Sequence, residues 1–423
     1  MMPNPTRIGI IGTGIAGLAA GKFLRDAGFA PILFEKNDQI GIDSHGVSVP
    51  TEDGPLRLDV PPRMLNQALW PELRSLYQSL GIEIQPVEPS KVFWIDSNGP
   101  MLKLEKSFFS SGMIRQLLSV EIRDIFRDIQ RMKDSVDQDI TQFHKSNFRE
   151  YLNGKAYSRS FIYQFLLPAL SSTLCTCSYQ ALDNYPVDTL LLAMKGVISS
   201  EGLFRTCKGT HEVAHRLTEE AEVRLSCPID SIEICGKSVR LRFDSNSTPS
   251  VDLDHVIVAT QANTASRLIA GQPGLPHDIL AGFQYESVTT VVHSDETLMP
   301  PHRKDWASFN LQSNADGTAG MCTMWMNRYY GFNGNNLFQT IMPYRKPEAS
   351  KVIKMAEMQR PVVNADSKSA IAQLGKYHSS ADRIWFCGSY AAPGVPLLES
   401  GVQSARAVVD RIVSKQACQA TST

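Results

Sequence analysis

The sequence predicts an α/β protein whose first domain contains a parallel sheet covered by helices, and three observations support this fold class. First, two short apolar runs, Arg7–Ile11 and Ile32–Phe34, flank a segment with apolar residues at helical spacing, Ile15–Asp26. Second, the apolar pattern changes to a period of two from Val223, which is typical of strands. Third, the chain ends as it begins, with a strand at Arg383–Cys387, a glycine turn and a final helix.

The turn after the first strand reads GTGIAG, residues 12–17. Gly12 permits a tight turn, Gly14 lets the backbone approach a pyrophosphate, and Gly17 lets the helix pack closely on the strand. The helix start presents free N–H groups and a partial positive charge to phosphates. Glu35 ends the second strand. Its separation from Gly12 is close to the ~20 residues expected for the acid that binds the ribose. The unit predicts dinucleotide binding without separating FAD from NAD, and the alternative is a glycine-rich turn in another α/β fold.

Bulk properties exclude several classes of protein. The chain has 423 residues, enough for two or three domains, and a formal net charge of −1, which gives no electrostatic footprint for nucleic acid or an anionic membrane. No apolar run approaches the ~18 residues of a spanning helix, and we expect no signal peptide, because Arg7 already begins the first strand. The eight cysteines are scattered and indicate reduced thiols, so we expect a cytoplasmic protein.

Two stretches interrupt the first domain. Residues 107–200 are expected to be mostly helical, with an apolar stripe made of Ile114, Leu117, Leu118, Ile122, Ile125, Phe126, Ile129 and Met132. We interpret this stripe as the core of a helical bundle that covers the substrate. Residues 265–375 form a second insertion, with strands near 288–292, 321–326 and 337–341. The predicted domains are 1–90, 201–264 and 376–415 for dinucleotide binding, 91–200 and 265–375 for the substrate, and 416–423 as a disordered tail.

The first and last units together resemble the FAD-dependent amine oxidase and phytoene desaturase superfamily. A narrower resemblance links the chain to a branch of predicted NAD/FAD-binding, amine-oxidase-like proteins. Its motifs are Phe34-Glu35, Asp59, Asn66, Pro71 and the blocks at 292–295, 299–300, 306–310, 324–328, 386–390 and 399–401. The resemblance covers the full length. It implies a discontinuous Rossmann-type FAD-binding domain with an inserted α+β substrate domain.

The resemblance also implies a set of cofactor-binding residues. The AMP and pyrophosphate would be held by Gly12, Gly14, Ala16, Gly17, Glu35 and Lys36, with Ile229 at the adenine and Gly388 and Ser389 closing on the pyrophosphate. Leu398, Glu399 and the helix start at Val402 would lie by the pyrimidine end of the flavin, and Arg63 and Met64 near its isoalloxazine. The usual attachment position before the last helix holds no cysteine, so we expect FAD to be non-covalent.

The chain departs from the superfamily pattern at several positions. Gly41-Ile42-Asp43 places an acid where a base usually follows two glycines, and Val60-Pro61 replaces a Thr-Gly. The lysine that many amine oxidases keep near flavin N5 has no counterpart around 287–291. The amine oxidases of this superfamily also have an aromatic cage with a second tyrosine, and this chain retains only Tyr390. These differences argue against a simple amine substrate.

Two residues are candidates for catalysis. Glu399 is either a proton acceptor facing the flavin or an acid favoured by the helix dipole, and Tyr390 is either a packing residue or part of the chemistry. His293 ends a predicted strand and is interpreted as structural. His211 and His215 form an HExxH pattern, typical of zinc sites on helices, but no convincing third ligand lies nearby in the sequence, so we expect no metal.

These observations predict an FAD-dependent oxidoreductase that takes hydride from a mostly apolar small molecule, by oxidation or desaturation in a biosynthetic pathway. Molecular oxygen is one candidate electron acceptor. The second hypothesis is a redox-neutral isomerase or cyclase of a polyene or fatty acid, as in some superfamily relatives. A zinc hydrolase and a non-catalytic flavin-binding protein are the remaining alternatives. The sequence does not predict the oligomeric state.

Overall fold

The computed structural model describes residues 6–52, 54–66, 69–95, 102–104, 119–198, 202–244 and 248–421. Within these residues a five-stranded parallel sheet has the order β19-β13-β1-β2-β9. Its strands are β1 (Ile8–Ile11), β2 (Ile32–Phe34), β9 (Glu222–Arg224), β13 (His255–Val258) and β19 (Ile384–Phe386). The beginning, middle and end of the chain therefore meet in one sheet, and the predicted α/β fold class is confirmed.

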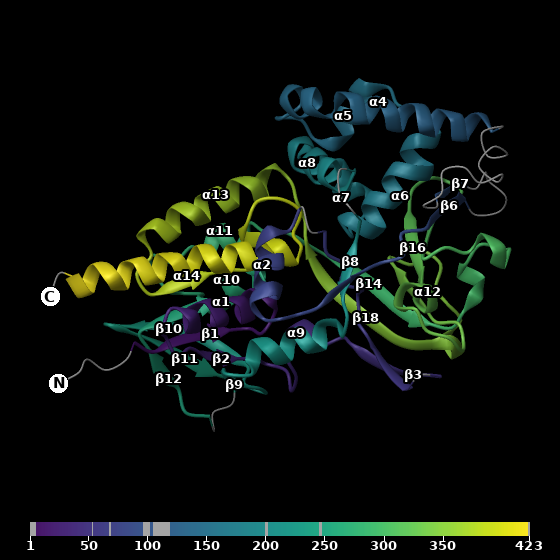
Figure 1. The fold of residues 1–423 in the computed structure, drawn as a ribbon. Coiled ribbons are helices and arrows are strands. Elements are labelled where there is room, and N and C mark those ends of the chain that lie inside the picture. The colour runs from purple at the N-terminus through teal and green to yellow at the C-terminus, as the bar shows by residue number, and fades with distance from the viewer. Residues whose placement is uncertain are drawn as a thin grey trace.

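Helices α1 (Ile15–Asp26) and α14 (Leu398–Thr421) pack side by side on one face of this parallel sheet (Figure 1). Successive side chains of a strand point to opposite faces, so Ile10 joins the apolar core under these helices and Ile11 joins the core on the other face. All four residues of β1 are buried, as expected for a strand covered on both sides.

The other face of the parallel sheet is covered by an antiparallel meander and three helices. These are β10 (Ile229–Cys235), β11 (Ser238–Phe243), β12 (Val251–Leu253), α10 (Ala262–Leu268), α11 (His277–Ala281) and α13 (Ala365–Ser380). The boundaries predicted at 264/265 and 375/376 cut α10 and α13. Both helices bury their apolar residues in the core of the parallel sheet, so the first domain extends further than the sequence suggested.

A second, mixed sheet carries the substrate domain. Among the described residues it has seven strands in the order β18-β14-β17-β16-β15-β6-β7. They are β6 (Lys91–Ile95), β7 (Leu102–Leu104), β14 (Tyr285–His293), β15 (Phe309–Ser313), β16 (Gly320–Trp325), β17 (Phe338–Ile341) and β18 (Val352–Pro361). Helix α12 (Met326–Tyr330) follows β16. The two insertions therefore build one sheet, because β6 pairs in parallel with β15.

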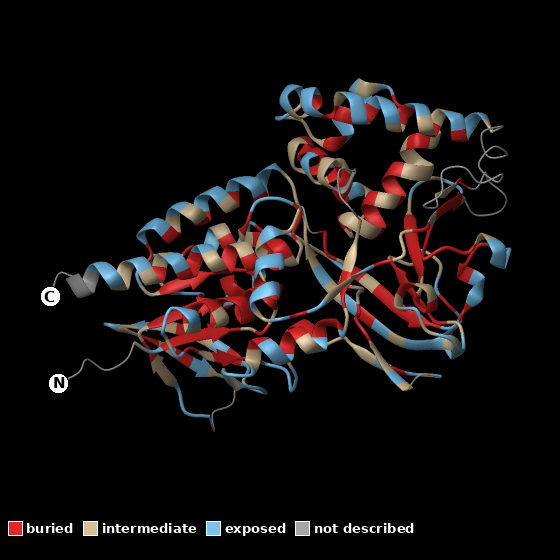
Figure 2. Cartoon of the chain, viewed as in Figure 1, coloured by how far each residue is buried: buried red, intermediate tan, exposed pale blue. Residues whose placement is uncertain are grey.

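A helical cap stands on the mixed sheet (Figure 1). It contains α4 (Val120–Gln142), α5 (Phe148–Lys155), α7 (Tyr179–Asp183) and α8 (Val187–Ile198). Figure 2 shows its exposed residues on the outer surface and its buried ones toward the sheet. The predicted stripe is confirmed for Ile122, Ile125 and Met132, which are buried, while Ile114, Leu117 and Leu118 lie outside the described residues.

Between α5 and α7 the backbone winds more widely than an α-helix. Phe161–Leu166 and Leu170–Leu174 are π-helical, separated by the short α6 (Leu167–Ala169) that contains Pro168. A proline cannot donate the hydrogen bond that a regular helix requires at its position. Short π-helical segments occur frequently at functional sites.

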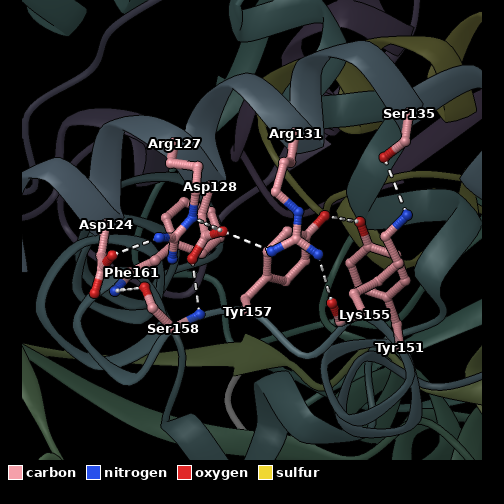
Figure 3. A network of polar contacts seen from close by, with 10 residues as sticks. All are labelled: Asp124, Arg127, Asp128, Arg131, Ser135, Tyr151, Lys155, Tyr157, Ser158 and Phe161. Atoms are coloured by element: carbon pink, nitrogen blue, oxygen red, sulfur yellow. Dashed lines mark hydrogen bonds and ion pairs between the residues drawn. The ribbon is translucent and has the colours of Figure 1, made fainter.

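Polar contacts of two buried carboxylates, Asp128 and Asp139, hold the cap together, and Figure 3 shows those of Asp128. Asp128 accepts hydrogen bonds from Ser158 N and Arg131 Nη1, each at 2.7 Å. Asp139 accepts from Lys155 Nζ at 2.9 Å and from the Tyr151 hydroxyl at 3.0 Å. Both carboxylates are on α4, and Tyr151, Lys155 and Ser158 are on or after α5, so the contacts with these three residues fix the cap helices relative to one another.

Short elements join the two sheets, and α14 extends beyond the predicted domain end. The linking elements are β3 (Val47–Thr51), β4 (Gly54–Leu58), α2 (Pro71–Ser79), β5 (Ile84–Pro86), β8 (Phe204–Thr206) and α9 (Gly209–Thr218). The tail predicted as disordered at 416–423 is helical as far as Thr421, because it continues α14 and Gln416 hydrogen-bonds His255. In the described part of the chain, no helix is long and apolar enough to cross a membrane.

Candidate active site

A cavity of about 730 Å³ connects the two sheets. It begins at the carboxyl edge of the parallel sheet, where Gly14, Thr260 and Gly388 follow β1, β13 and β19. It continues between the mixed sheet and the cap, lined there by Phe93 and Phe165 among other apolar side chains. The carboxyl edge of an open parallel sheet is the usual ligand site of such folds.

The glycine turn forms the first wall of this cavity. Gly12 has φ +102°, in the region that favours glycine, and a Cβ on Gly17 would lie 2.0 Å from the Gly12 carbonyl oxygen. Gly14 differs, because a Cβ there would meet no other atom within 4 Å. Gly14 is the N-cap of α1 and supplies no side-chain cap, and Ala16 also lines the cavity. The helix start therefore offers its N–H groups to the cavity.

The predicted ribose acid lies beside this turn. Glu35 is buried, and its carboxylate accepts hydrogen bonds from Thr13 N at 3.0 Å, Thr13 Oγ1 at 2.6 Å and Asn37 N at 3.1 Å. Lys36 is exposed, and Ile229 is buried in the core that contains β2. These residues are near the carboxyl edge but do not line the cavity, so their contact with AMP stays a prediction.

The remaining predicted cofactor residues divide into two groups. Gly388, Ser389, Leu398, Arg63 and Met64 all line the cavity. Val402 lies one turn further along α14, fully buried in the core beneath α1, and does not line it. The structure thus brings the two glycine turns and the start of α14 together around one space.

Two segments depart from the superfamily pattern, at 41–43 and 60–61. The carboxylates in or next to them, Asp43 and Asp59, do not line the cavity. Asp43 pairs with Arg57, with Nε to Oδ2 at 2.9 Å, and accepts a hydrogen bond from Thr210 Oγ1 at 3.1 Å. Asp59 accepts from Thr210 N and Oγ1, both at 2.8 Å, at the start of α9. Burial raises the pKa of Asp59. Both carboxylates therefore point to α9 and β4, and neither lines the cavity.

The two catalytic candidates have different surroundings. Tyr390 lines the cavity, and its ring packs edge-on against Phe283 at 4.9 Å. In the described structure its buried hydroxyl has no hydrogen-bond partner. Glu399 is buried away from the cavity wall and accepts from Glu72 N at 3.1 Å and Leu73 N at 2.8 Å. It caps the start of α2, whose own N-cap provides no side-chain bond, so its geometry favours a structural role.

The histidine candidates lie outside the cavity wall. His211 and His215 are both exposed on α9, and no group of three His, Cys, Asp or Glu among the described residues is placed to hold a metal ion. His293 is fully buried, accepts a hydrogen bond from Asp295 N at 3.1 Å, and lies 2.8 Å from Thr340 Oγ1. Burial lowers the pKa of His293 to about 4, which keeps the ring neutral.

Sequence reasoning missed several residues of the substrate end. Lys91 and Phe93 on β6, Met358 and Arg360 on β18, and His45 after the ribose loop all line the cavity. The strands β6 and β18 come to line one cavity only through the pairing of the mixed sheet. The π-helical segments add Phe161 and Leu170, among others. The apolar run at 161–170 was visible in the sequence, but nothing there showed which side it faces.

The residues present fit an FAD pyrophosphate. The uncapped start of α1, the open space at Gly14 and the wall at Gly388–Ser389 supply N–H donors and room, and the nearby acids are turned away. Anions bind at such helix starts. Beyond them, Arg63 adds a positive charge to the wall. The fold and this edge define a flavin-type dinucleotide-binding protein.

Comparison with known proteins identifies the family. The model of flavin containing amine oxidoreductases matches residues 15–352, so the chain belongs to this family. FAD is its cofactor, and the chain is an FAD-dependent oxidoreductase. No curated protein sequence matches the chain at a significant level.

Solved structures share the fold at low sequence identity. A putative protoporphyrinogen oxidase from Exiguobacterium sp. 255-15 has a TM-score of 0.69 and 14% identity, covering 97% of this chain and 99% of its own. Cyclohexylamine oxidase from Brevibacterium oxydans IH-35A has a TM-score of 0.65 and 15% identity, covering 98% of this chain and 100% of its own. A CLA-producing fatty acid isomerase from P. acnes has a TM-score of 0.65 and 14% identity, covering 96% of this chain and 98% of its own. At these identities the comparison establishes the fold alone.

Proposed function

We propose that the protein takes a hydride from a mostly apolar small molecule, in an oxidation or desaturation, with molecular oxygen or another acceptor receiving the electrons. The observation that carries this proposal is the single cavity that joins the glycine turn to an apolar chamber. FAD, when bound, supplies the hydride acceptor. The chain's own residues bind, orient and exclude water.

The chamber favours an apolar substrate. Phe93, Phe165, Leu311 and Ile341 line it from the mixed sheet and the cap, and burying such surface contributes about 25 cal/mol per Å². Covering by the cap also keeps water from the reacting carbon. A substrate of mainly hydrocarbon character is therefore bound and held dry by the same walls.

Few groups on the cavity wall are able to move a proton. Among its described residues there is no aspartate or glutamate, and burial lowers the pKa of His45, which keeps that imidazole neutral. As a neutral imidazole, His45 is our candidate for accepting a proton from the substrate and passing it on, because the protonated ring is disfavoured there. The unpaired hydroxyl of Tyr390 is a candidate donor to a polar group of the cofactor or the substrate.

A second candidate function is redox-neutral isomerisation of a polyene or fatty acid. The fold shared with a fatty acid isomerase and the apolar chamber favour it. The non-covalent state of FAD belongs to both proposals, because Cys387 is buried behind Gly388 and does not line the cavity.

The test begins with the visible spectrum of the purified protein. Release of intact FAD on heating is the expected result, and a protein that is colourless and takes up no added FAD would contradict both proposals. Anaerobic incubation with candidate substrates then separates them. Lasting bleaching of the flavin that air reverses supports oxidation, whereas product formed without air or added acceptor supports isomerisation.

A further inference from the structure

The charges on the cavity wall are all of one sign. Lys91, Arg63 and Arg360 line the cavity, and its described lining residues include no aspartate or glutamate. A cation removed from water is costly unless an anion or hydrogen-bond acceptors compensate it. The described wall itself supplies no carboxylate to these side chains, and an anionic ligand is one source of negative charge.

Arg63 and Arg360 are explained by their places near the flavin end. Arg63 follows β4 on the segment that reaches the glycine turn and the start of α14, close to the expected flavin. Arg360 binds two backbone carbonyl oxygens, Pro396 O at 2.9 Å and Cys175 O at 3.0 Å. It thus joins β18 to the segment before α14 and to the end of the π-helical run.

Neither the flavin end nor a contact with backbone carbonyl groups explains why Lys91 is on the cavity wall. It lies on β6, at the side of the mixed sheet that is remote from β18 and from the helices α1 and α14 (Figure 1). Its strand partners are Phe309 on β15 and Leu104 on β7, and directly paired residues share a face. Both partners also line the cavity.

The ammonium group of Lys91 is therefore aimed into the apolar end of the cavity. Within the described residues, Lys91 makes no side-chain hydrogen bond and no ion pair. Burial lowers its pKa, which shows how poorly the surrounding side chains stabilise the charge. A lysine in this position gains a partner only when an anion enters the chamber.

We propose that the substrate is a long apolar carboxylic acid whose carboxylate pairs with Lys91, while its hydrocarbon chain extends through the chamber toward the flavin end. This inference rests on the proposed function and names its substrate class. It places the reacting carbon at the flavin end, away from the acid group, because β6 lies at the side of the mixed sheet that is remote from β18. An amine of the same length meets like charges on every charged side chain of the wall.

The sheet provides a matched control. Lys103 is on β7, directly opposite Val92, and Val92 belongs to a separate apolar cluster with Trp94 and Ala307. Lys103 thus points to the other face, where its Nζ donates to Lys304 O at 3.0 Å, and it does not line the cavity. Lys91→Met and Lys103→Met remove the same charge from opposite faces of neighbouring strands.

The experiment measures binding without turnover. Radiolabelled hexadecanoic acid, hexadecan-1-ol and hexadecylamine are each equilibrated by dialysis with the FAD-loaded protein, below their aggregation concentrations. For the wild type we expect the acid to bind at least about tenfold more tightly than the alcohol, and the amine to bind most weakly, because a charge-assisted contact replaces a neutral one. Lys91→Met should lose the preference for the acid, whereas Lys91→Arg and Lys103→Met should keep it.

The outcomes are separable from those of the proposed function. Equal binding of acid and alcohol by the wild type, or a preference for acid that survives Lys91→Met, would overturn the inference. If Lys91→Met does not fold, Lys91→Gln, which also removes the charge, replaces it in the same comparison and should likewise lose the preference for the acid. FAD content is read from the visible spectrum of the same samples, so a flavin-free protein that still prefers the acid refutes the proposed function but leaves the pairing of a carboxylate with Lys91 standing.

Discussion

Gly14 and Gly17 belong to one motif, but the structure predicts opposite consequences for their substitution. Gly14 has φ −66° and ψ 174°, which any residue adopts, and a Cβ there meets no other atom within 4 Å. In Gly14→Val the loss of glycine freedom stabilises the fold and the poorer N-cap destabilises it, so the unfolding free energy should change by less than about 1 kcal/mol. The valine side chain instead occupies the cofactor cradle. Overpacking costs about 1–3 kcal/mol, which corresponds to FAD binding weakened about tenfold to a hundredfold.

Gly17→Ala should damage the fold itself. Its Cβ would lie 2.0 Å from the Gly12 carbonyl oxygen, and backbone cannot move aside as a flexible side chain can. We expect a loss of about 3 kcal/mol or more. Thermal melting of the FAD-free proteins measures stability, and titration with FAD measures binding. The reasoning fails if Gly14→Val binds FAD as tightly as the wild type, or if its FAD-free form melts as low as Gly17→Ala.

Three further predictions concern residues away from the cavity wall. Glu399→Ala should cost about 1–2 kcal/mol through loss of the cap on α2 and leave kcat within a few-fold, in melting and turnover assays; a hundredfold loss of kcat would instead restore the catalytic role. Asp139→Asn leaves its lysine partner unpaired and should cost about 3 kcal/mol in urea titrations, whereas the exposed Asp137→Asn should cost less than about 1 kcal/mol; equal losses would mean that the cap is not held by Asp139. Burial lowers the pKa of His293 from 6.5 to about 4, so the folded state binds fewer protons in that window. The unfolding free energy should fall as pH drops through it, by about 3 kcal/mol from this group, and His293→Gln should remove that part of the slope in urea titrations at several pH values; an unchanged slope would show that His293 is not the group responsible.

Local signals in the sequence were sufficient to place the two glycine turns at the carboxyl edge of the parallel sheet. The glycine turn and Glu35 are separated by one helix and one strand, so their spacing alone places them at the carboxyl edge of neighbouring strands. The same reasoning located Gly388 and Ser389, because a second strand–glycine–helix unit repeats the geometry. Their position at this edge could be predicted because each turn lies within one supersecondary unit.

Glu399 shows why catalytic residues were harder to predict. Its place at the start of a helix beside the flavin made it a plausible base. The groups that engage its carboxylate, Glu72 N and Leu73 N, come from the other end of the chain and start a helix with no cap of its own. Capping across such a separation leaves no periodic pattern, so only the tertiary structure separates the two roles.

The placement of the buried carboxylates supports the proposal that Lys91 pairs with an anionic ligand. The described chain buries Glu35, Asp43, Asp59, Asp128, Asp139, Asp295 and Glu399. Each is engaged by backbone N–H groups, hydroxyls or cations of the protein, and none lines the cavity. The fold thus satisfies buried acids internally while leaving Lys91 without a partner in the wall. Because a cation on an apolar wall is stabilised by a nearby anion, we explain the place of Lys91 by an anion that arrives with the ligand. The pyrophosphate supplies negative charge at one end of the cavity, and an acid group of the substrate would supply it at the other.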